Sequence, residues 1–363
     1  IMNNENKKII IFAAGTGGHV YPGLSIAKEL MLNNIIVLWI GTERGIEKNI
    51  IGNSEIPIKY IEFSGIRGKG VLPYIKLPYK LIKSIAQSFK IIMEYKPDIV
   101  LSMGGYISVP CVITSFILRI PIIIHEQNII FGLSNNILRF LSNKVILCFP
   151  MQIKNKKYKY LGNPTRYEGF KKIKKIKKND QINILIIGGS LGAKIFNEII
   201  PQAIYILKNN TNIKINILHQ TGKTLKVAEI QYNHLDINVD LREYIDSMDE
   251  AYNWCDIILC RGGAITISEI MCLGIPAIII PYPYATDNHQ MKNAKFLEKN
   301  NAAVVIDQKN FSAQYLESIF KKLIDNTSIR ESLSKNIFNL NKKNSTRNIC
   351  KEITLGINSI NTL

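Results

Sequence analysis

The fold of this chain is decided by two similar stretches, Ile10-Ile11-Phe12-Ala13-Ala14-Gly15-Thr16-Gly17-Gly18 and Ile184-Leu185-Ile186-Ile187-Gly188-Gly189-Ser190-Leu191-Gly192. In each stretch, apolar residues typical of a buried strand run into a glycine turn, and a helical pattern follows. Such a turn lets backbone N–H groups approach a ligand at the N-terminus of the helix. Two copies predict two Rossmann-like domains, and we expect the ligand to bind between them.

Outward from these stretches, β-branched runs alternate with longer amphipathic segments, which predicts βαβ units and an α/β fold with parallel sheets. The charged stretch from Arg166 to Asp180 predicts an interdomain linker. We therefore expect one domain over residues 1–164, a second over 165–345, and a last helix over 346–363 that either closes the second domain or returns to the first. The expected strands are 8–13, 35–40, 58–62, 98–102, 121–125, 144–148, 182–187, 214–219, 237–241, 256–260, 276–281 and 302–306.

Composition excludes several classes of protein. A chain of 363 residues with 47% hydrophobic content can bury two cores, so disorder is not a serious candidate. The six cysteines lie in apolar segments without metal-ligand spacing, which favours buried, reduced thiols. The longest apolar stretch, residues 107–124, is broken by Pro110, Arg119 and Pro121, so we expect a soluble chain without a membrane span.

The net charge of +18 has three interpretations: nucleic acid, an anionic surface such as a bilayer or phosphorylated substrate, or drift in a chain rich in Ile, Lys and Asn. No nucleic-acid binding motif accompanies the charge. The segment from Gly68 to Lys83 interleaves apolar and aromatic residues with lysines, as a membrane-binding surface does. A core helix with lysines that extend to solvent is the alternative.

The candidate catalytic and ligand-binding residues lie in or next to the glycine turns. The first lacks the spacing of a dinucleotide site or a P-loop, and His19 follows it at the carboxyl end of a strand. There an imidazole can act as a general base, although a helix-capping histidine explains the position equally well. The second turn, with the Ser190 hydroxyl, suits a pyrophosphate, and Arg166 could assist through its guanidinium.

The most informative segment runs from Cys260 to Glu269, where a buried strand ends and a helix begins. Its first N–H groups can receive a diphosphate, and Glu269 can accept both hydroxyls of a ribose. An ordinary helix charge is the alternative for Glu269. The amides between Asp287 and Asn293 suit sugar hydroxyls or, alternatively, an N-cap. No Asp-x-Asp pair is present to hold a nucleotide-bound metal, so we expect a metal-independent mechanism without a cofactor.

The ordered motifs of the chain resemble the MurG-type N-acetylglucosaminyltransferases of peptidoglycan synthesis. The motifs that carry this resemblance are Gly15-Thr16-Gly17-Gly18-His19 with Pro22-Gly23, Gly104-Gly105-Tyr106, His125-Glu126-Gln127-Asn128, Gly162-Asn163-Pro164, Gly188 to Ala193, His219-Gln220-Thr221-Gly222, Cys260 to Glu269, and Gln290 with Asn293-Ala294. Each motif alone is weak, but the series spans nearly the whole chain in one order.

The resemblance implies a GT-B fold and inverting transfer of GlcNAc from UDP-GlcNAc to the MurNAc 4-hydroxyl of lipid I, with His19 as base. It also implies that the domain over residues 1–164 is the acceptor and membrane side and that the domain over residues 165–345 binds UDP-GlcNAc. It also implies a peripheral protein at the cytoplasmic face of the inner membrane, with roles in cell division and cell shape. Its partners would be UDP-GlcNAc, lipid I, an anionic membrane surface and other cell-wall synthesis proteins, but no nucleic acid. The donor contacts it implies are Thr16, Gly17, Gly18, Asn128, Arg166, Ser190, Ile245, Ala264, Ile265, Thr266, Ile267, Ser268, Glu269 and Gln290.

Ile245 belongs to a segment, Tyr244 to Met248, that looks like the family's uracil-contacting segment. The chain departs from the family pattern at Ala14, where a glycine is common, and at Gly262, where a serine is frequent. Both positions keep a small residue, so these departures leave the resemblance intact. Two alternatives stay open: a UDP-N-acetylglucosamine 2-epimerase, which has a similar fold and donor, and a nucleic-acid binding protein suggested by the charge.

Overall fold

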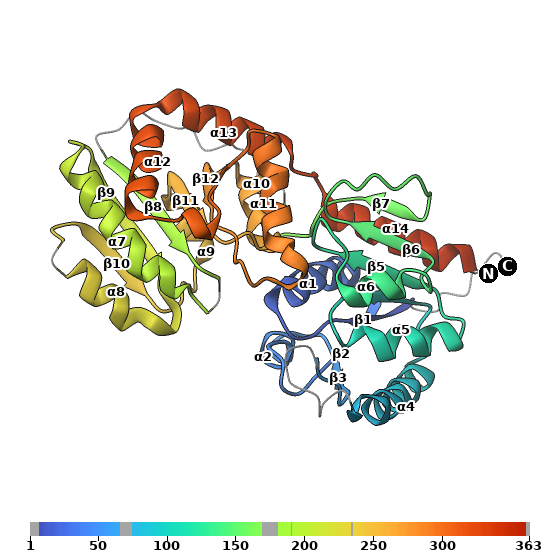
Figure 1. Ribbon diagram of the computed structural model, residues 1–363. Helices are drawn as coiled ribbons and strands as arrows, with labels where there is room; N and C mark the ends of the chain where they lie inside the picture. The colour runs from blue at the N-terminus through green and yellow to red at the C-terminus, as the bar shows by residue number, and fades with distance from the viewer. Residues whose placement is uncertain (1–6, 66–74, 169–180, 190, 234, 361–363) are drawn as a thin grey trace. The chain divides into compact units, whose positions relative to one another are not determined.

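The computed structural model describes residues 7–65, 75–168, 181–189, 191–233 and 235–360. The chain forms two compact units: unit 1 comprises residues 1–168 and 342–363, and unit 2 comprises residues 169–341. Figure 1 labels the elements of both units. Most of the predicted linker lies outside the described residues. The functions predicted for the two domains stay predictions.

Unit 1 is built on a seven-stranded parallel sheet with the strand order β3-β2-β1-β4-β5-β6-β7. The central strand β1 is buried on both faces: Ile9 and Ile11 face one core, and Ile10 and Phe12 face the other. Such continuous apolar strands are typical of parallel sheets covered by helices on both sides. The strands are β1 (Lys8–Phe12), β2 (Ile36–Gly41), β3 (Ile58–Tyr60), β4 (Ile99–Ser102), β5 (Ile122–Glu126), β6 (Lys144–Leu147) and β7 (Tyr158–Tyr160).

The helices of unit 1 divide between the two faces of the sheet. The first core contains residues of α1, α2 and α14, and the second contains residues of α4, α5 and α6. The bounds are α1 (Gly17–Leu32), α2 (Glu47–Gly52), α4 (Leu77–Tyr95), α5 (Ser108–Ile117), α6 (Leu133–Leu138) and α14 (Ser345–Ile360).

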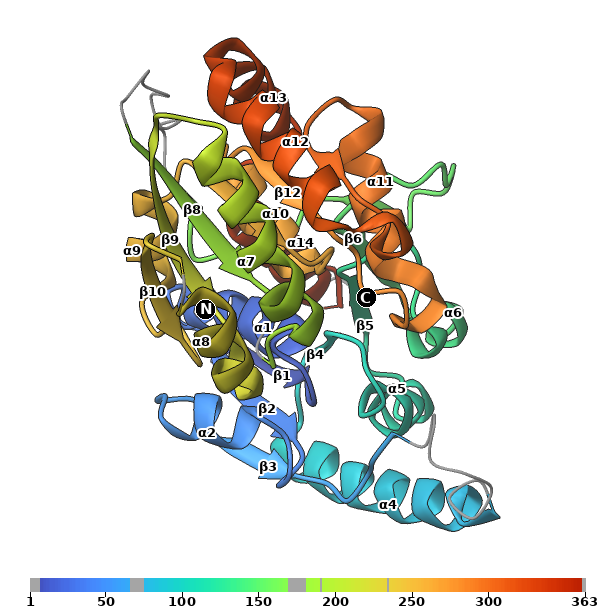
Figure 2. The same ribbon diagram turned by 60° about the vertical axis from the view of Figure 1, so that its left-hand side comes forward.

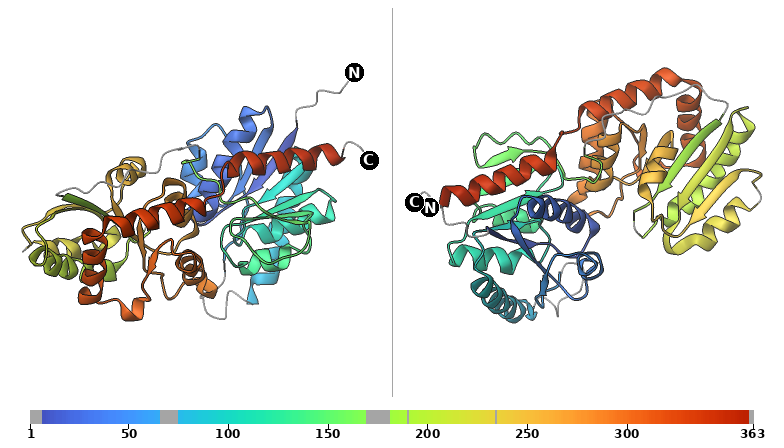
Figure 3. Two further views of the ribbon diagram at one scale, coloured as in Figure 1. Left: turned by 90° about the horizontal axis from the view of Figure 1, so that it is seen from above. Right: turned by 180° about the vertical axis from the view of Figure 1, so that it is seen from behind.

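The last helix, α14, returns to unit 1, where it packs beside α1 (Figure 3). Ile349, Ile353 and Ile357 recur every four residues and are fully buried in the first core. At the start of the helix, the Glu168 carboxylate accepts hydrogen bonds from the N–H and the hydroxyl of Thr346. This carboxylate meets N–H groups that a helix start leaves without an intrahelical acceptor.

Unit 2 contains a six-stranded parallel sheet with the order β10-β9-β8-β11-β12-β13. Figure 2 shows α7 and α12 side by side, and Phe196 and Phe320 from these helices join the core with residues of β8. The strands are β8 (Gln181–Ile187), β9 (Lys214–Gln220), β10 (Asn238–Arg242), β11 (Ile257–Cys260), β12 (Ala277–Ile279) and β13 (Val304–Val305). The α-helices are α7 (Lys194–Asn209), α8 (Leu225–Tyr232), α9 (Met248–Trp254), α10 (Ala264–Leu273), α11 (His289–Lys299), α12 (Ala313–Asp325) and α13 (Thr327–Asn339).

The predicted α/β class with two parallel sheets is confirmed, and every predicted strand is present. The sequence analysis missed β7, whose three residues, Tyr-Lys-Tyr, pair with β6 at the edge of the first sheet. All six cysteines are buried, and none of them forms a disulfide bond. No helix among the described residues has the length and apolar character needed to cross a bilayer.

Candidate active site

The first glycine turn joins β1 to α1. Gly15 has a φ of +95° and lies against Tyr106, where a Cβ would be 3.2 Å from the ring atom Cε1. A residue with a side chain would be strained at this position, so the turn requires glycine. Thr16, Gly17 and Gly18 then stand at the N-terminus of α1. Because the helix dipole favours negative charge there, these predicted residues lie where an anion could bind.

A buried carboxylate holds this turn in place. Glu47, the first residue of α2, is fully buried, and its Oε2 accepts a hydrogen bond from the N–H of Gly15 at 3.1 Å. Its Oε1 accepts from the N–H and the hydroxyl of Thr42, at 2.8 and 2.7 Å. The carboxyl group has room because residue 45 is glycine: a Cβ there would lie 2.0 Å from Oε2. Glu47 therefore connects the first glycine turn to the end of β2.

His19 lies half-buried in the first turn of α1. Its Nδ1 is 3.2 Å from the hydroxyl oxygen of Thr16. The ring lies beside the turn that follows β4, where a Cβ on Gly104 or Gly105 would be 3.5 Å from ring atoms. The imidazole thus has contacts on more than one side that restrict its orientation, as a general base requires.

The second histidine at this edge of the sheet, His125 in β5, has a different environment. It is fully buried, with Nδ1 3.0 Å from Gln127 Nε2 and Nε2 3.3 Å from Cys148 Sγ. Burial lowers the pKa of His125 to about 3, and the nearby His19 acts in the same direction. His125 is therefore neutral near pH 7 and belongs to the core. This contrast leaves His19 as the better placed of the two for acid–base chemistry.

Glu126 arranges the segment that contains the predicted residue Asn128. Its Oε1 accepts hydrogen bonds from the N–H and the side-chain amide of Asn128, at 3.0 and 3.3 Å. Its Oε2 accepts from the N–H of Gly132 and the amide of Asn135, at 3.1 and 2.9 Å. Burial raises the pKa of Glu126, while these hydrogen bonds act against that increase. Asn128 is thus fixed at the carboxyl end of β5, the same edge at which His19 lies.

In unit 2 the predicted run from 264 to 269 forms the first half of α10. The N–H groups of Ala264, Ile265 and Thr266 lie in the first turn, where a helix leaves donors for a ligand. The side chains of Ile267 and Ser268 are buried, and the Ser268 hydroxyl donates to the carbonyl of Ala264 at 2.7 Å. The helix start can therefore meet a diphosphate through backbone groups, whereas these two side chains face the protein interior.

Glu269 follows on the same helix and is half-buried. Its Oε2 accepts a hydrogen bond from the hydroxyl of Tyr252 in α9 at 2.8 Å. Tyr252 is buried, so its hydroxyl can fix the orientation of the carboxylate. A carboxylate has about four lone-pair sites, so the hydrogen bond from Tyr252 does not by itself prevent it from accepting the hydroxyls of a ribose.

Gln290, in the first turn of α11, connects two other segments of unit 2. Its Oε1 accepts hydrogen bonds from the N–H groups of Gly262 and Tyr282, at 3.1 and 3.0 Å. The backbones of Gly262 and Gln290 also lie close together, because a Cβ on Gly262 would be 2.4 Å from the carbonyl oxygen of Gln290. A serine at residue 262 would therefore require the start of α11 to move in this structure.

Arg261 supports the same region from within the core. Its Nη1 donates to the carbonyl of Ile280 and to Oε1 of Gln308, at 3.0 and 2.8 Å, and its guanidinium lies 4.4 Å from the ring centre of Phe196. Burial lowers the pKa of Arg261 to about 10. Since the group remains charged near pH 7 and is bound to the protein, we assign it a structural role.

The remaining predicted residues have separate positions. Ile245 is buried, and its N–H donates to Gln220 Oε1 at 3.1 Å. Arg166 is exposed in unit 1, with its guanidinium 5.3 Å from the ring centre of Tyr167. Ser190 lies outside the described residues. No group of three or more potential metal ligands occurs in the part of the chain that the structure describes.

The predicted residues thus form two sets, one at the carboxyl ends of the unit 1 strands and one at those of unit 2. Sequence reasoning missed four residues that orient them: Glu47, Glu126, Tyr252 and Gln220. Gln220 had a signal, because it lies in a quoted motif at the end of a buried strand. The sequence signal for Glu47 was weaker, since it is only a carboxylate shortly after a glycine. No sequence signal pointed to Tyr252.

Two Rossmann-like units, each with a helix N-terminus and polar side chains at its carboxyl edge, match the GT-B fold of glycosyltransferases. Family models agree: the glycosyltransferase family 28 N-terminal domain matches residues 9–147, and the C-terminal domain of that family matches residues 183–353. The chain belongs to glycosyltransferase family 28.

One relative, from Francisella philomiragia, is named UDP-N-acetylglucosamine–N-acetylmuramyl-(pentapeptide) pyrophosphoryl-undecaprenol N-acetylglucosamine transferase. It is 40% identical over 97% of this chain and 98% of its own length. A crystal structure of Acinetobacter baumannii MurG has a TM-score of 0.80 and 31% identity, covering 96% of this chain and 99% of that one. The resemblance to the MurG-type family is therefore confirmed.

A UDP-GlcNAc 2-epimerase from Neisseria meningitidis, bound to UDP-GlcNAc, has a TM-score of 0.68 and 17% identity, covering 96% of this chain and 99% of that one. At that level of identity the likeness shows a shared fold.

Proposed function

We propose that this enzyme transfers N-acetylglucosamine from UDP-GlcNAc to the 4-hydroxyl of MurNAc in undecaprenyl-pyrophosphoryl-MurNAc-pentapeptide, the conversion of lipid I to lipid II. The observation that carries the proposal is the match, along nearly the whole chain, to a relative whose name states this transfer. Support comes from the site residues, because both glycine turns and the α10 start offer groups suited to a nucleotide diphosphate.

Unit 2 would bind most of the donor. The backbone N–H groups of Ala264, Ile265 and Thr266 would meet the diphosphate, and Glu269 would accept the ribose hydroxyls. Because Oε1 of Gln290 already accepts two N–H groups, its Nε2 is the part of that side chain that would meet a sugar hydroxyl. The other proposed donor contacts are Thr16, Gly17, Gly18, Asn128, Arg166, Ser190, Ile245, Ile267 and Ser268.

His19 would act as the general base in a single displacement. It would remove the proton of the MurNAc 4-hydroxyl while that oxygen attacks C1 of GlcNAc and UDP leaves, so the anomeric configuration inverts. A positioned general base contributes typically about 10²–10⁴-fold. The charge that develops on UDP would be stabilised by the α10 N-terminus, without a metal.

The test is transfer of labelled GlcNAc from UDP-GlcNAc to a lipid I analogue by the purified chain, with and without EDTA. We expect a labelled disaccharide product and equimolar UDP in both conditions. An otherwise identical reaction without acceptor addresses the epimerase alternative, which predicts UDP-ManNAc there. Formation of UDP-ManNAc without any transfer product would overturn the proposal.

We further propose that unit 1 binds an anionic membrane surface through α4, so that the enzyme works as a peripheral protein at the cytoplasmic face. The side of α4 that faces the protein carries the buried residues Ser84, Ser88 and Ile92. The opposite side exposes large apolar residues, with Tyr79 72% and Ile82 68% exposed. This exposure argues against the alternative of a core helix.

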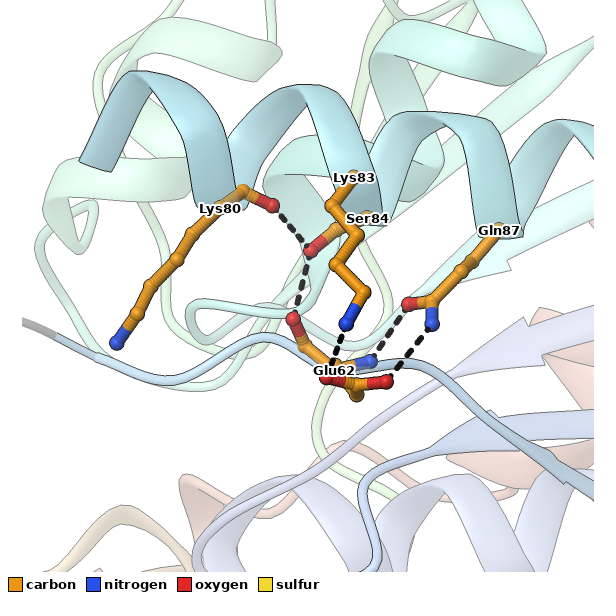
Figure 4. A network of polar contacts seen from close by, with 5 residues as sticks. All are labelled: Glu62, Lys80, Lys83, Ser84 and Gln87. Atoms are coloured by element: carbon orange, nitrogen blue, oxygen red, sulfur yellow. Dashed lines mark hydrogen bonds and ion pairs between the residues drawn. The ribbon is translucent and has the colours of Figure 1, made fainter. Parts of the chain in front are cut away.

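The lysines of this surface are not equivalent. Lys83 forms an ion pair with Glu62 at 2.7 Å, and Ser84 and Gln87 bind the same residue (Figure 4). Its charge is therefore largely compensated, and Glu62, through its hydrogen bond and charge, raises the pKa of Lys83. No carboxylate of the described residues pairs with Lys76 or Lys80, so these two supply the charge for an anionic surface. The part of the predicted segment from Gly68 to Tyr74 lies outside the described residues.

Vesicle sedimentation separates these contributions. Each lysine near an anionic leaflet contributes about 1 kcal/mol, so replacing Lys76 and Lys80 with glutamate should weaken binding to acidic vesicles by at least about thirtyfold. The control variant changes Lys28 and Lys48, which lie on α1 and α2, to glutamate. Equal weakening by both pairs would indicate net charge rather than this surface, and wild-type protein that stays in the supernatant at low salt would refute membrane binding.

A further inference from the structure

One buried amide connects two segments of unit 2 that sequence reasoning had treated separately. Gln220 is the last residue of β9, and its side chain is 5% exposed. Its Nε2 donates to the carbonyl of Gly189 at 2.8 Å, and its Oε1 accepts from the N–H of Ile245 at 3.1 Å. One partner can only accept and the other can only donate, so the orientation of the amide is determined by its partners.

The two partners belong to segments predicted to contact different parts of UDP, one the pyrophosphate and the other the uracil. Gly189 lies in the glycine turn after β8, and Ile245 lies in the segment that resembles a uracil-binding one. The Gly189 carbonyl also accepts from the N–H of Gly192 at 2.9 Å. With two donors, that oxygen is directed toward the protein and away from a phosphate, which it would otherwise repel.

We infer that Gln220 is a positioning residue that sets the spacing between the pyrophosphate-binding turn and the uracil-binding segment. This inference rests on the proposed function, since it assumes that UDP occupies both segments. A ligand that contacts both segments binds more tightly when their spacing is fixed, because the second contact then requires little additional ordering of the protein. For a ligand that contacts only one segment, the fixed spacing increases the affinity much less.

A matched position on the same strand separates this role from ordinary sheet stability. Asn216 in β9 is also buried and also bridges the neighbouring strands: its Nδ2 donates to Asn183 in β8, and its Oδ1 accepts from Asn238 in β10. It lies near the opposite end of β9, away from both proposed binding segments. The variants Gln220→Met and Asn216→Leu each replace a bridging amide by an apolar side chain of similar size.

The experiment measures the Kd of wild type and both variants for UDP and for uridine by calorimetry, together with Tm. For Gln220→Met we expect the Kd of UDP to rise about tenfold, as for loss of a buried hydrogen-bonded bridge, and that of uridine less than about threefold. The KM for UDP-GlcNAc should rise similarly, with kcat nearly unchanged. Asn216→Leu should lower Tm without a change in either Kd.

Three results would overturn the inference: an unchanged Kd for UDP in Gln220→Met, equal weakening of UDP and uridine, or the same UDP defect in Asn216→Leu. If Gln220→Met does not fold, Gln220→Asn serves instead, because it keeps the amide but is one methylene too short to bridge. Wild-type protein that fails to bind UDP would count against the proposed function itself.

Discussion

Replacing Glu47 tests whether a buried carboxylate stabilises the first glycine turn. Glu47→Ala removes the acceptor of three hydrogen bonds, from the Gly15 N–H and from the N–H and hydroxyl of Thr42. The site is fully buried, so water replaces these contacts poorly. Glu43→Gln is the matched control, because that glutamate lies four residues earlier and is exposed.

The structure sets the size of the effect. A buried donor left without a partner costs about 1–3 kcal/mol, so two such amides and a hydroxyl predict a loss of about 3 kcal/mol or more. For a unit of this size, 1 kcal/mol lowers Tm by about 2–4 °C, which predicts a decrease of about 6–12 °C. Glu47→Gln keeps the volume and one acceptor oxygen, so we expect about half of that decrease.

The assay is thermal unfolding followed by circular dichroism and calorimetry at one protein concentration. Gly45→Ala provides an independent test, because its Cβ would displace the same carboxyl group and should lower Tm similarly. The reasoning is refuted if Glu47→Ala and Glu43→Gln both unfold within about 2 °C of wild type.

Three further predictions concern the site. His19→Ala should lower kcat by about 10²-fold or more while the Kd for UDP stays the same, because the base lies in unit 1 and the donor contacts lie mostly in unit 2; a decrease below tenfold would identify another base. Glu269→Gln should raise the donor KM, and Tyr252→Phe should raise it less, since it only releases the carboxylate; donor kinetics that match wild type would remove Glu269 from the site. For His125, the folded pKa of about 3 lies below the unfolded value, so the unfolded state takes up the proton first and stability is lost as pH falls below about 6.5. His125→Gln should flatten that part of the stability profile measured by denaturant unfolding, and an unchanged slope would show that other groups cause the loss.

The fold was predictable because its signals are local. Runs such as Ile9 to Phe12 are apolar on both faces, and that pattern indicates a buried parallel strand without knowledge of its neighbours. The short edge strand β7 lacks this signal: its residues, Tyr158 to Tyr160, are half-buried, and aromatic and charged side chains alternate over only three positions, which is too short a run to indicate a strand. Its pairing with β6 depends on the rest of the sheet.

The candidate site was predictable where a turn brings its own residues to a ligand, as at the starts of α1 and α10. It was not predictable where a distant side chain fixes that turn. Glu47 lies 32 residues from Gly15, and Gln220 lies 31 residues from Gly189. Contacts of this kind arise from strand order, which a single sequence does not state.

Each of the two units stabilises its glycine turn with a distant side chain, but the two side chains form different hydrogen bonds. A glycine turn allows a ligand to approach the backbone, but glycine has the greatest conformational freedom to lose, so an ordered turn needs support from outside. In each unit the support follows the strand next to the turn: Glu47 after β2, and Gln220 at the end of β9. Glu47 accepts from the N–H of Gly15 and so removes one donor from a ligand, whereas Gln220 donates to the carbonyl of Gly189 and occupies none of the N–H groups of its turn. Since a diphosphate needs donors, this difference supports the assignment of the nucleotide to unit 2.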